Sequence, residues 1–116
     1  MKCQGLPGVA GKCFTVHGRL YVSNGTPSVR LLKIGTKRIL GASDEGDDLP
    51  ACLRKFLAVG TFIYGDFLVC PLKPDRPGWM RPVCVESVSK LVLERYDDQN
   101  RPTVIIPARR SCRLGE

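Results

Sequence analysis

The sequence predicts a mainly β protein, an antiparallel β-sandwich with one short α-helix, and three observations lead to this class. Short β-prone runs recur at intervals of about ten residues with Gly, Pro, Asn or Asp between them, as in sandwiches and barrels. Only one stretch has the apolar periodicity of a helix. Six cysteines in 116 residues indicate covalent reinforcement of one small core. We therefore expect a single domain over residues 1–116, with loose segments at 1–12 and 107–116.

The clearest strand is predicted for residues 14–22, where apolar and polar side chains alternate and define one buried and one wet face. The side chains of the wet face are Thr15, His17, Arg19 and Tyr21. Asn24 and Gly25 tolerate positive φ and predict a hairpin turn. The chain should then return as a strand over residues 28–34. Residues 37–40 form a further strand or continue the same one past a bulge.

One short helix is predicted around residues 49–58, because its apolar residues fall on a single stripe. The stripe consists of Leu49, Cys52, Leu53, Phe56 and Leu57. Asp47 or Asp48 can cap the start of this helix, and Gly60 stands just past its end. A helix of this length is marginal alone, so the stripe should dock on the sheet with Cys52 facing inward.

The second half of the chain predicts more strands. Gly65 and Asp66 separate two β-prone runs and form either a tight turn or a bulge. A Pro-rich loop is expected at residues 73–78, and a turn at residues 97–100. The predicted strands are 61–64, 67–70, 83–85, 89–95 and 103–106.

Three motifs resemble the pattern of transthyretin-like and carboxypeptidase-regulatory-like domains. They are Val-His-Gly-Arg-Leu at 16–20, Asn-Gly-Thr-Pro-Ser-Val-Arg-Leu at 24–31 and Tyr-Gly-Asp-Phe-Leu-Val at 64–69. The chain has Gly65-Asp66-Phe67 where those domains have Asp-Gly-x-Phe, and it inserts a helix between the two halves. The resemblance implies a secreted, seven-stranded, prealbumin-like sandwich with a carrier, adhesion or accessory role, and does not by itself define a ligand.

The cysteines predict disulfides. Six cysteines at irregular spacing are typical of secreted frameworks, and no two are close enough for a zinc knuckle. The candidates are Cys3, Cys13, Cys52, Cys70, Cys84 and Cys112. Short sequence separations favour Cys3 with Cys13 and Cys70 with Cys84, which leaves Cys52 and Cys112. The other reading is six buried free thiols.

The disulfides in turn predict an extracytoplasmic protein, secreted or periplasmic. Residues 1–8 have no apolar core of a signal peptide, so we interpret the chain as a mature form with an added start methionine. A cytoplasmic location is the alternative. No apolar run approaches the roughly 20 residues of a transmembrane helix.

The net charge of +7 lies entirely in the first third of the chain, since residues 1–43 contain seven Lys or Arg and no acid. A basic face of this kind attracts a polyanionic or protein partner, with nucleic acid the less favoured choice. The alternative reading of the whole chain is an OB-like β-barrel that binds nucleic acid or another polyanion. The candidate surface residues are His17, Arg19, Tyr21, Arg30, Lys33, Lys37, Arg38 and Trp79.

No catalytic constellation, cofactor site or metal site is predicted. His17 is the only histidine and lies on a wet strand face, and the acidic residues cluster in turns, where they serve the backbone. Trp79 is either a recognition anchor at a loop tip or a lid over one end of the sandwich. The predicted function is a non-enzymatic secreted or periplasmic binding or accessory module, with its ligand and oligomeric state left open.

Overall fold

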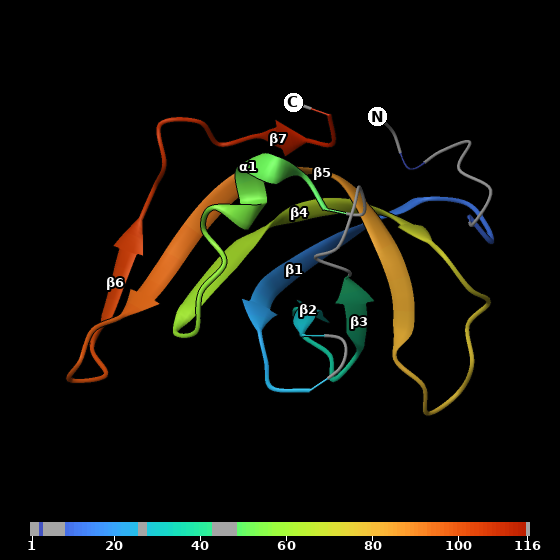
Figure 1. Cartoon of the computed structure of the whole chain (residues 1–116), viewed down its shortest axis with the longest axis horizontal. Coiled ribbons are helices and arrows are strands. Elements are labelled where there is room, and N and C mark those ends of the chain that lie inside the picture. Colours follow the sequence, from blue (N-terminus) through green and yellow to red (C-terminus); the bar gives the residue numbers. More distant parts are fainter. Residues whose placement is uncertain (1–2, 4–8, 26–27, 43–48, 116) are drawn as a thin grey trace.

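The computed structural model describes residues 3, 9–25, 28–42 and 49–115, and these form strands with one short helix (Figure 1). The prediction of a mainly β, largely antiparallel fold with a single short helix is confirmed for these residues. The elements are β1 (Phe14–Val22), β2 (Val29–Lys33), β3 (Ile39–Ala42), α1 (Ala51–Arg54), β4 (Thr61–Pro71), β5 (Arg81–Tyr96), β6 (Pro102–Ile105) and β7 (Cys112–Arg113).

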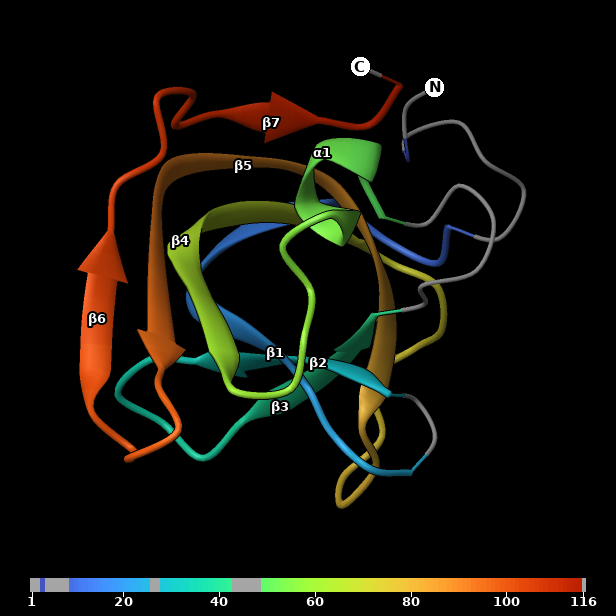
Figure 2. The same ribbon diagram turned by 60° about the vertical axis from the view of Figure 1, so that its left-hand side comes forward.

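The pairings of five strands form a closed ring, because β5 pairs both with β4 and with β3. The hydrogen-bonded order is β3-β2-β1-β4-β5, with antiparallel neighbours, and β5 also pairs with β3 in parallel. Helix α1 lies between β3 and β4 in the sequence. Figure 2 shows how strongly β5 bends around the other strands.

Strand β5 pairs with four other strands. One edge pairs with β4, while the other pairs successively with β3, β7 and β6. The two strands predicted at 83–85 and 89–95 are therefore one continuous strand of 16 residues. The runs at 61–64 and 67–70 are likewise one strand, and the register shift between Tyr64 and Asp66 identifies the bulge alternative as correct.

The core lies on the inner face of the sheet, where the buried apolar side chains of the strands pack together. In β1 the buried side chains are those of Val16 and Leu20, as the alternation predicts. Large side chains from the other elements complete the core, namely Leu31, Leu49, Leu53, Ile63, Phe67, Leu91 and Leu93. The opposite face of β1 remains available for contacts outside the core.

Two glycines face each other inside the sheet, Gly18 of β1 and Gly65 of β4. A Cβ on Gly65 would lie 2.6 Å from Cγ2 of Val88 and 2.8 Å from the backbone oxygen of Ser89. A Cβ on Gly18 would lie 2.7 Å from Cδ1 of Leu31. Both positions therefore require glycine for close approach of neighbouring strands.

The helix is shorter than predicted. Helix α1 covers only Ala51–Arg54, although Leu49 and Leu53 are buried as the stripe requires. Pro50 occupies the N-cap position without a side-chain cap, while Asp47 and Asp48 lie outside the described residues. Beyond Arg54 the amides bond to carbonyls only three residues back, so the regular helix gives way to turns before β4 begins.

The terminal segments, expected to be loose, make specific contacts where they are described. The Ala10 amide donates to the Pro71 carbonyl at 2.8 Å. At the other end, β7 pairs with β5 and the Leu114 amide donates to the Glu86 carbonyl at 2.7 Å. The carboxylate of the same Glu86 accepts from the amide of Cys3 at 3.1 Å. Segments near both ends of the chain thus meet at one residue of β5.

All six cysteines form disulfides, and the expected pairs Cys3 with Cys13 and Cys70 with Cys84 are wrong. The bonds are Cys3–Cys84, Cys13–Cys70 and Cys52–Cys112. Strand register explains the difference. Phe14 lies opposite Val69, so the preceding Cys13 comes beside Cys70 rather than Cys3. The third bond links α1 to β7.

Candidate functional site

The predicted basic face lies on the outer side of β1, β2 and the β2–β3 turn. His17, Arg19 and Tyr21 project from the outer face of β1, and Arg30 on β2 lies directly opposite Tyr21. Lys33 and Lys37 are exposed at the turn. The structure therefore places the predicted cations on adjacent elements, although several of them already have partners.

Arg19 is held among aromatic rings. Its guanidinium lies 4.8 Å from the centre of the Phe62 ring and 5.6 Å from that of Tyr21. Phe62 also packs edge-on against Tyr96 at 5.7 Å. Cation–π contacts of this kind hold the side chain in place and partly cover its charge. The sequence did not indicate this arrangement, because Phe62 and Tyr96 come from strands distant in the chain.

His17 is paired with a carboxylate on the neighbouring strand. Its Nδ1 lies 2.8 Å from Oδ1 of Asp66, and Nζ of Lys90 lies 3.7 Å from Oδ2. The hydrogen bond from His17, assisted by the charge of Lys90, lowers the pKa of Asp66 below its ordinary value. Because every cysteine is in a disulfide, His17 has no thiol to activate.

Among the described residues, one cluster has side chains of the types that bind metal ions, and two of its three members are in disulfides. Cys3, Cys70 and Glu86 bring their ligand atoms within 4.8 Å of one another. Both sulfurs are bonded to other cysteines, so neither is a thiolate, which is the form that binds metal. The Glu86 carboxylate accepts the amide of Cys3 instead.

A hollow lies at the β4–β5 loop (residues 72–80) and has a volume of about 220 Å³. We call it the Trp79 hollow, and it is lined by Gly41, Lys73, Pro74, Arg76, Trp79, Met80, Arg81 and Pro82. Trp79 is 64% exposed, so it does not form the lid considered above. The Arg76 guanidinium lies 4.9 Å from the centre of its ring. The hollow thus combines an exposed indole with three cations.

An ion pair joins the hollow to the basic face. Arg38 of the β2–β3 turn pairs with Asp75 of the β4–β5 loop, and this contact lowers the pKa of Asp75. Arg81 fixes the loop further, since its Nε donates to the Lys73 carbonyl at 3.0 Å. The acid of the loop is thereby neutralised by Arg38, which leaves the lining of the hollow cationic.

Sequence reasoning selected Trp79 but missed Lys73, Arg76 and Arg81. The signal was present, because these cations alternate with Pro and Gly on both sides of the indole. Gly41 could not have been found in this way, since only the parallel pairing of β3 with β5 brings it to the loop.

Among the residues that the structure describes, no helix has the length and apolar character needed to cross a bilayer. No family model, curated protein or solved structure matches the chain. The resemblance to transthyretin-like domains therefore stays a prediction.

Proposed function

We propose that the protein is a non-enzymatic, extracytoplasmic binding module that binds an acidic polysaccharide through the Trp79 hollow and the adjoining basic face. The exposed Trp79, with Arg76 against its ring and Lys73 and Arg81 beside it, carries the proposal. An indole left largely in water is a typical recognition anchor. Its flat face can stack on a sugar ring, while the surrounding cations pair with carboxylate groups.

The strand order supports this placement of the site. The ring of pairings β1-β2-β3-β5-β4, with a helix between β3 and β4, supports the alternative of an OB-like barrel. Such barrels bind oligonucleotides and oligosaccharides on the face of strands 2 and 3 and on the loops that join strands 1–2 and 4–5. In this chain the Trp79 hollow lies at one of those places, the loop that joins β4 and β5. The fold analogy bears on where a ligand binds, and the side chains bear on which ligand.

The disulfides favour a polysaccharide over a nucleic acid. Three disulfides persist in oxidising compartments, outside the reducing cytosol. Acidic glycans are abundant polyanions of such surroundings, whereas most nucleic-acid binders work in the cytosol or nucleus. A basic surface attracts both acidic polysaccharides and nucleic acids. We prefer the polysaccharide because disulfides favour an oxidising compartment.

The test uses Trp79 itself, since it is the only tryptophan in the chain. Oligogalacturonate should change the tryptophan fluorescence in a saturable way, while neutral dextran should not. By calorimetry, Trp79→Ala and Arg76→Gln should each weaken binding by about tenfold or more. The matched control is Arg110→Gln, which removes a cation before β7 and should leave affinity unchanged.

Two outcomes would contradict the proposal. One is an unaltered affinity for oligogalacturonate in Trp79→Ala. The other is tighter binding of a single-stranded oligonucleotide, with a steep loss of affinity on adding salt, which would favour the nucleic-acid alternative instead.

A further inference from the structure

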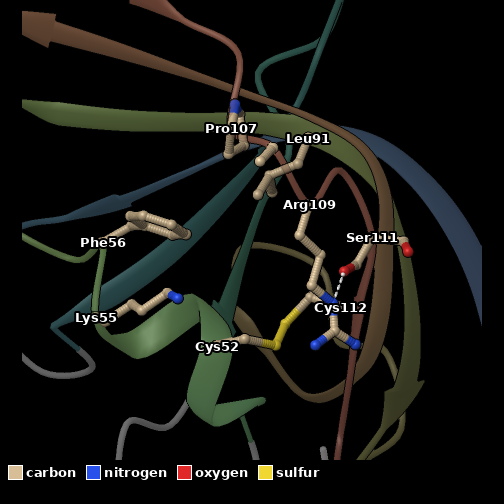
Figure 3. Close-up of a pocket in the computed structure, with 9 residues that line it drawn as sticks. Cys52, Lys55, Phe56, Leu91, Pro107, Arg109, Ser111 and Cys112 are labelled. Carbon is tan, nitrogen blue, oxygen red and sulfur yellow. Dashed lines mark hydrogen bonds between the residues drawn. A yellow bond between two sulfur atoms is a disulfide. The ribbon is translucent and has the colours of Figure 1, made fainter.

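A second cavity lies between α1 and the segment that leads into β7 (Figure 3). Its volume is about 240 Å³. The lining residues are Cys52, Lys55, Phe56, Leu91, Pro107, Ala108, Arg109, Ser111 and Cys112. The Trp79 hollow shares none of these residues, so the two sites are separate.

The walls of this cavity are fixed to the rest of the fold. The Cys52–Cys112 disulfide bonds α1 to β7. The segment between β6 and β7 is tied to β5, because the Leu91 amide donates to the Arg110 carbonyl at 3.0 Å. Leu91 is itself buried in the core. A covalent bond and a strand contact therefore fix the positions of the walls, which reduces the cost of ordering them around a ligand.

The lining is apolar with two cations. Phe56, Leu91 and Pro107 form one part of the wall, and Figure 3 shows Lys55 and Arg109 on either side of the space they enclose. The Arg109 Nε donates to the Ser111 carbonyl at 2.9 Å, which orients its guanidinium. Lys55 lies with its Nζ 5.1 Å from the centre of the Phe56 ring. None of the lining residues is acidic.

We propose that this cavity binds a small amphipathic carboxylate, such as a medium-chain fatty acid. The hydrocarbon chain would lie against Phe56, Leu91 and Pro107, where removal of apolar surface from water drives binding. The carboxylate would pair with the cationic groups of Lys55 and Arg109, which Figure 3 shows at the cavity. A volume of about 240 Å³ lies below the roughly 300–1,000 Å³ of sites for drug-sized ligands, which restricts the ligand to a short chain.

Three matched probes test the two halves of this chemistry. Octanoate carries both the chain and the charge, octanol carries the chain alone, and acetate carries the charge alone. Titration followed by NMR should give saturable shifts at Phe56, Leu91 and Ala108 with octanoate. Octanol should bind at least about fivefold more weakly, and acetate should produce no saturable shift at these residues.

Substitutions at the cavity separate specific binding from general affinity for apolar surfaces. Lys55→Gln and Arg109→Gln should each weaken octanoate binding by about three- to tenfold and leave octanol binding unchanged. Ala108→Trp, at an exposed position of the rim, should fill the space and abolish binding of both probes. Arg110→Gln is the control and should have no effect on octanoate.

The proposal is overturned if octanoate binds the Lys55→Gln/Arg109→Gln double variant as tightly as the parent protein. It is equally overturned if octanol matches octanoate, or if the shifts fall outside the cavity. Trp79→Ala should leave octanoate binding intact, so failure of the polysaccharide proposal has no bearing on this result.

Discussion

Cys70 of β4 and Cys84 of β5 lie directly opposite each other in register, yet each is bonded to a cysteine from the first 13 residues of the chain. Cys84 bonds to Cys3 and Cys70 to Cys13, and the opposed pair is fully buried. The N-terminal segment is thus clamped at two adjacent points of the sheet. Their arrangement makes the disulfides the first target for experiment.

Removing the Cys3–Cys84 bond by a double Cys→Ala change should destabilise the protein. The bond spans 81 residues, and restricting the unfolded chain over a loop of that order stabilises the fold by about 4 kcal/mol in the chain-entropy model. Urea unfolding of the parent and the variant would measure the difference. A loss below about 1 kcal/mol would contradict the expectation, and the Cys52→Ala/Cys112→Ala variant provides a comparison with a shorter loop of 60 residues.

Gly65→Ala should destabilise the fold by about 1–3 kcal/mol, the usual cost of overpacking a core. The added methyl would overlap Val88 and the backbone of Ser89, and backbone cannot turn aside as a flexible side chain can. Gly11→Ala is the matched control, because its nearest neighbour would be Cγ of Pro71 at 3.4 Å. Equal midpoints of urea unfolding for the two variants would show that the close approach at Gly65 is not limiting.

Asp66 should titrate below its ordinary pKa of 3.8, because His17 and Lys90 favour its charged form. A lowered pKa in the folded state means that this stabilisation is present above pH 3.8 and is lost as the pH falls through the folded value. Carbonyl NMR across acidic pH would give the midpoint. His17→Ala should move the midpoint upward, whereas Thr15→Ala, on the same face of β1, should leave it in place.

Arg38→Gln should loosen the β4–β5 loop as well as remove a charge. The substitution breaks the pair with Asp75, so the pKa of Asp75 should rise toward its ordinary value and an unpaired carboxylate should remain near the Trp79 hollow. We therefore expect it to weaken binding of oligogalacturonate more than Lys37→Gln, which removes one charge from the neighbouring position. Calorimetry on the two variants decides the matter, and equal losses would show that Arg38 acts by charge alone.

Local patterns in the sequence were sufficient to predict some elements of the fold. The bounds of β1 agree with the prediction because strict alternation from Phe14 to Val22 records one buried face directly. Strand β5 was divided in two because Glu86 and Ser87 interrupt its apolar run, and only its partners show that the strand continues. The two residues of β7 form a strand solely through their pairing with β5.

The disulfide pairing and the make-up of the two candidate sites could not be predicted from the sequence, because both depend on contacts between residues far apart in the chain. Proximity in the chain suggested the wrong disulfides, since the register of β1 on β4 determines which cysteines meet. Trp79 was identified from its loop, but its link to the basic face depends on Arg38 reaching Asp75 across the fold. The cavity at α1 needs a helix, β5 and the segment before β7 to converge, and no local pattern encodes that meeting.

Glu86 receives the amide of Cys3 on its carboxylate and that of Leu114 on its backbone oxygen. Regions from opposite ends of the polypeptide are neighbours in space, which is the geometry that permits circular permutation. A permutant joined by a short linker across this junction and opened at the Asn24-Gly25 turn should retain all three cross-links. Fusion partners could then be attached at that turn.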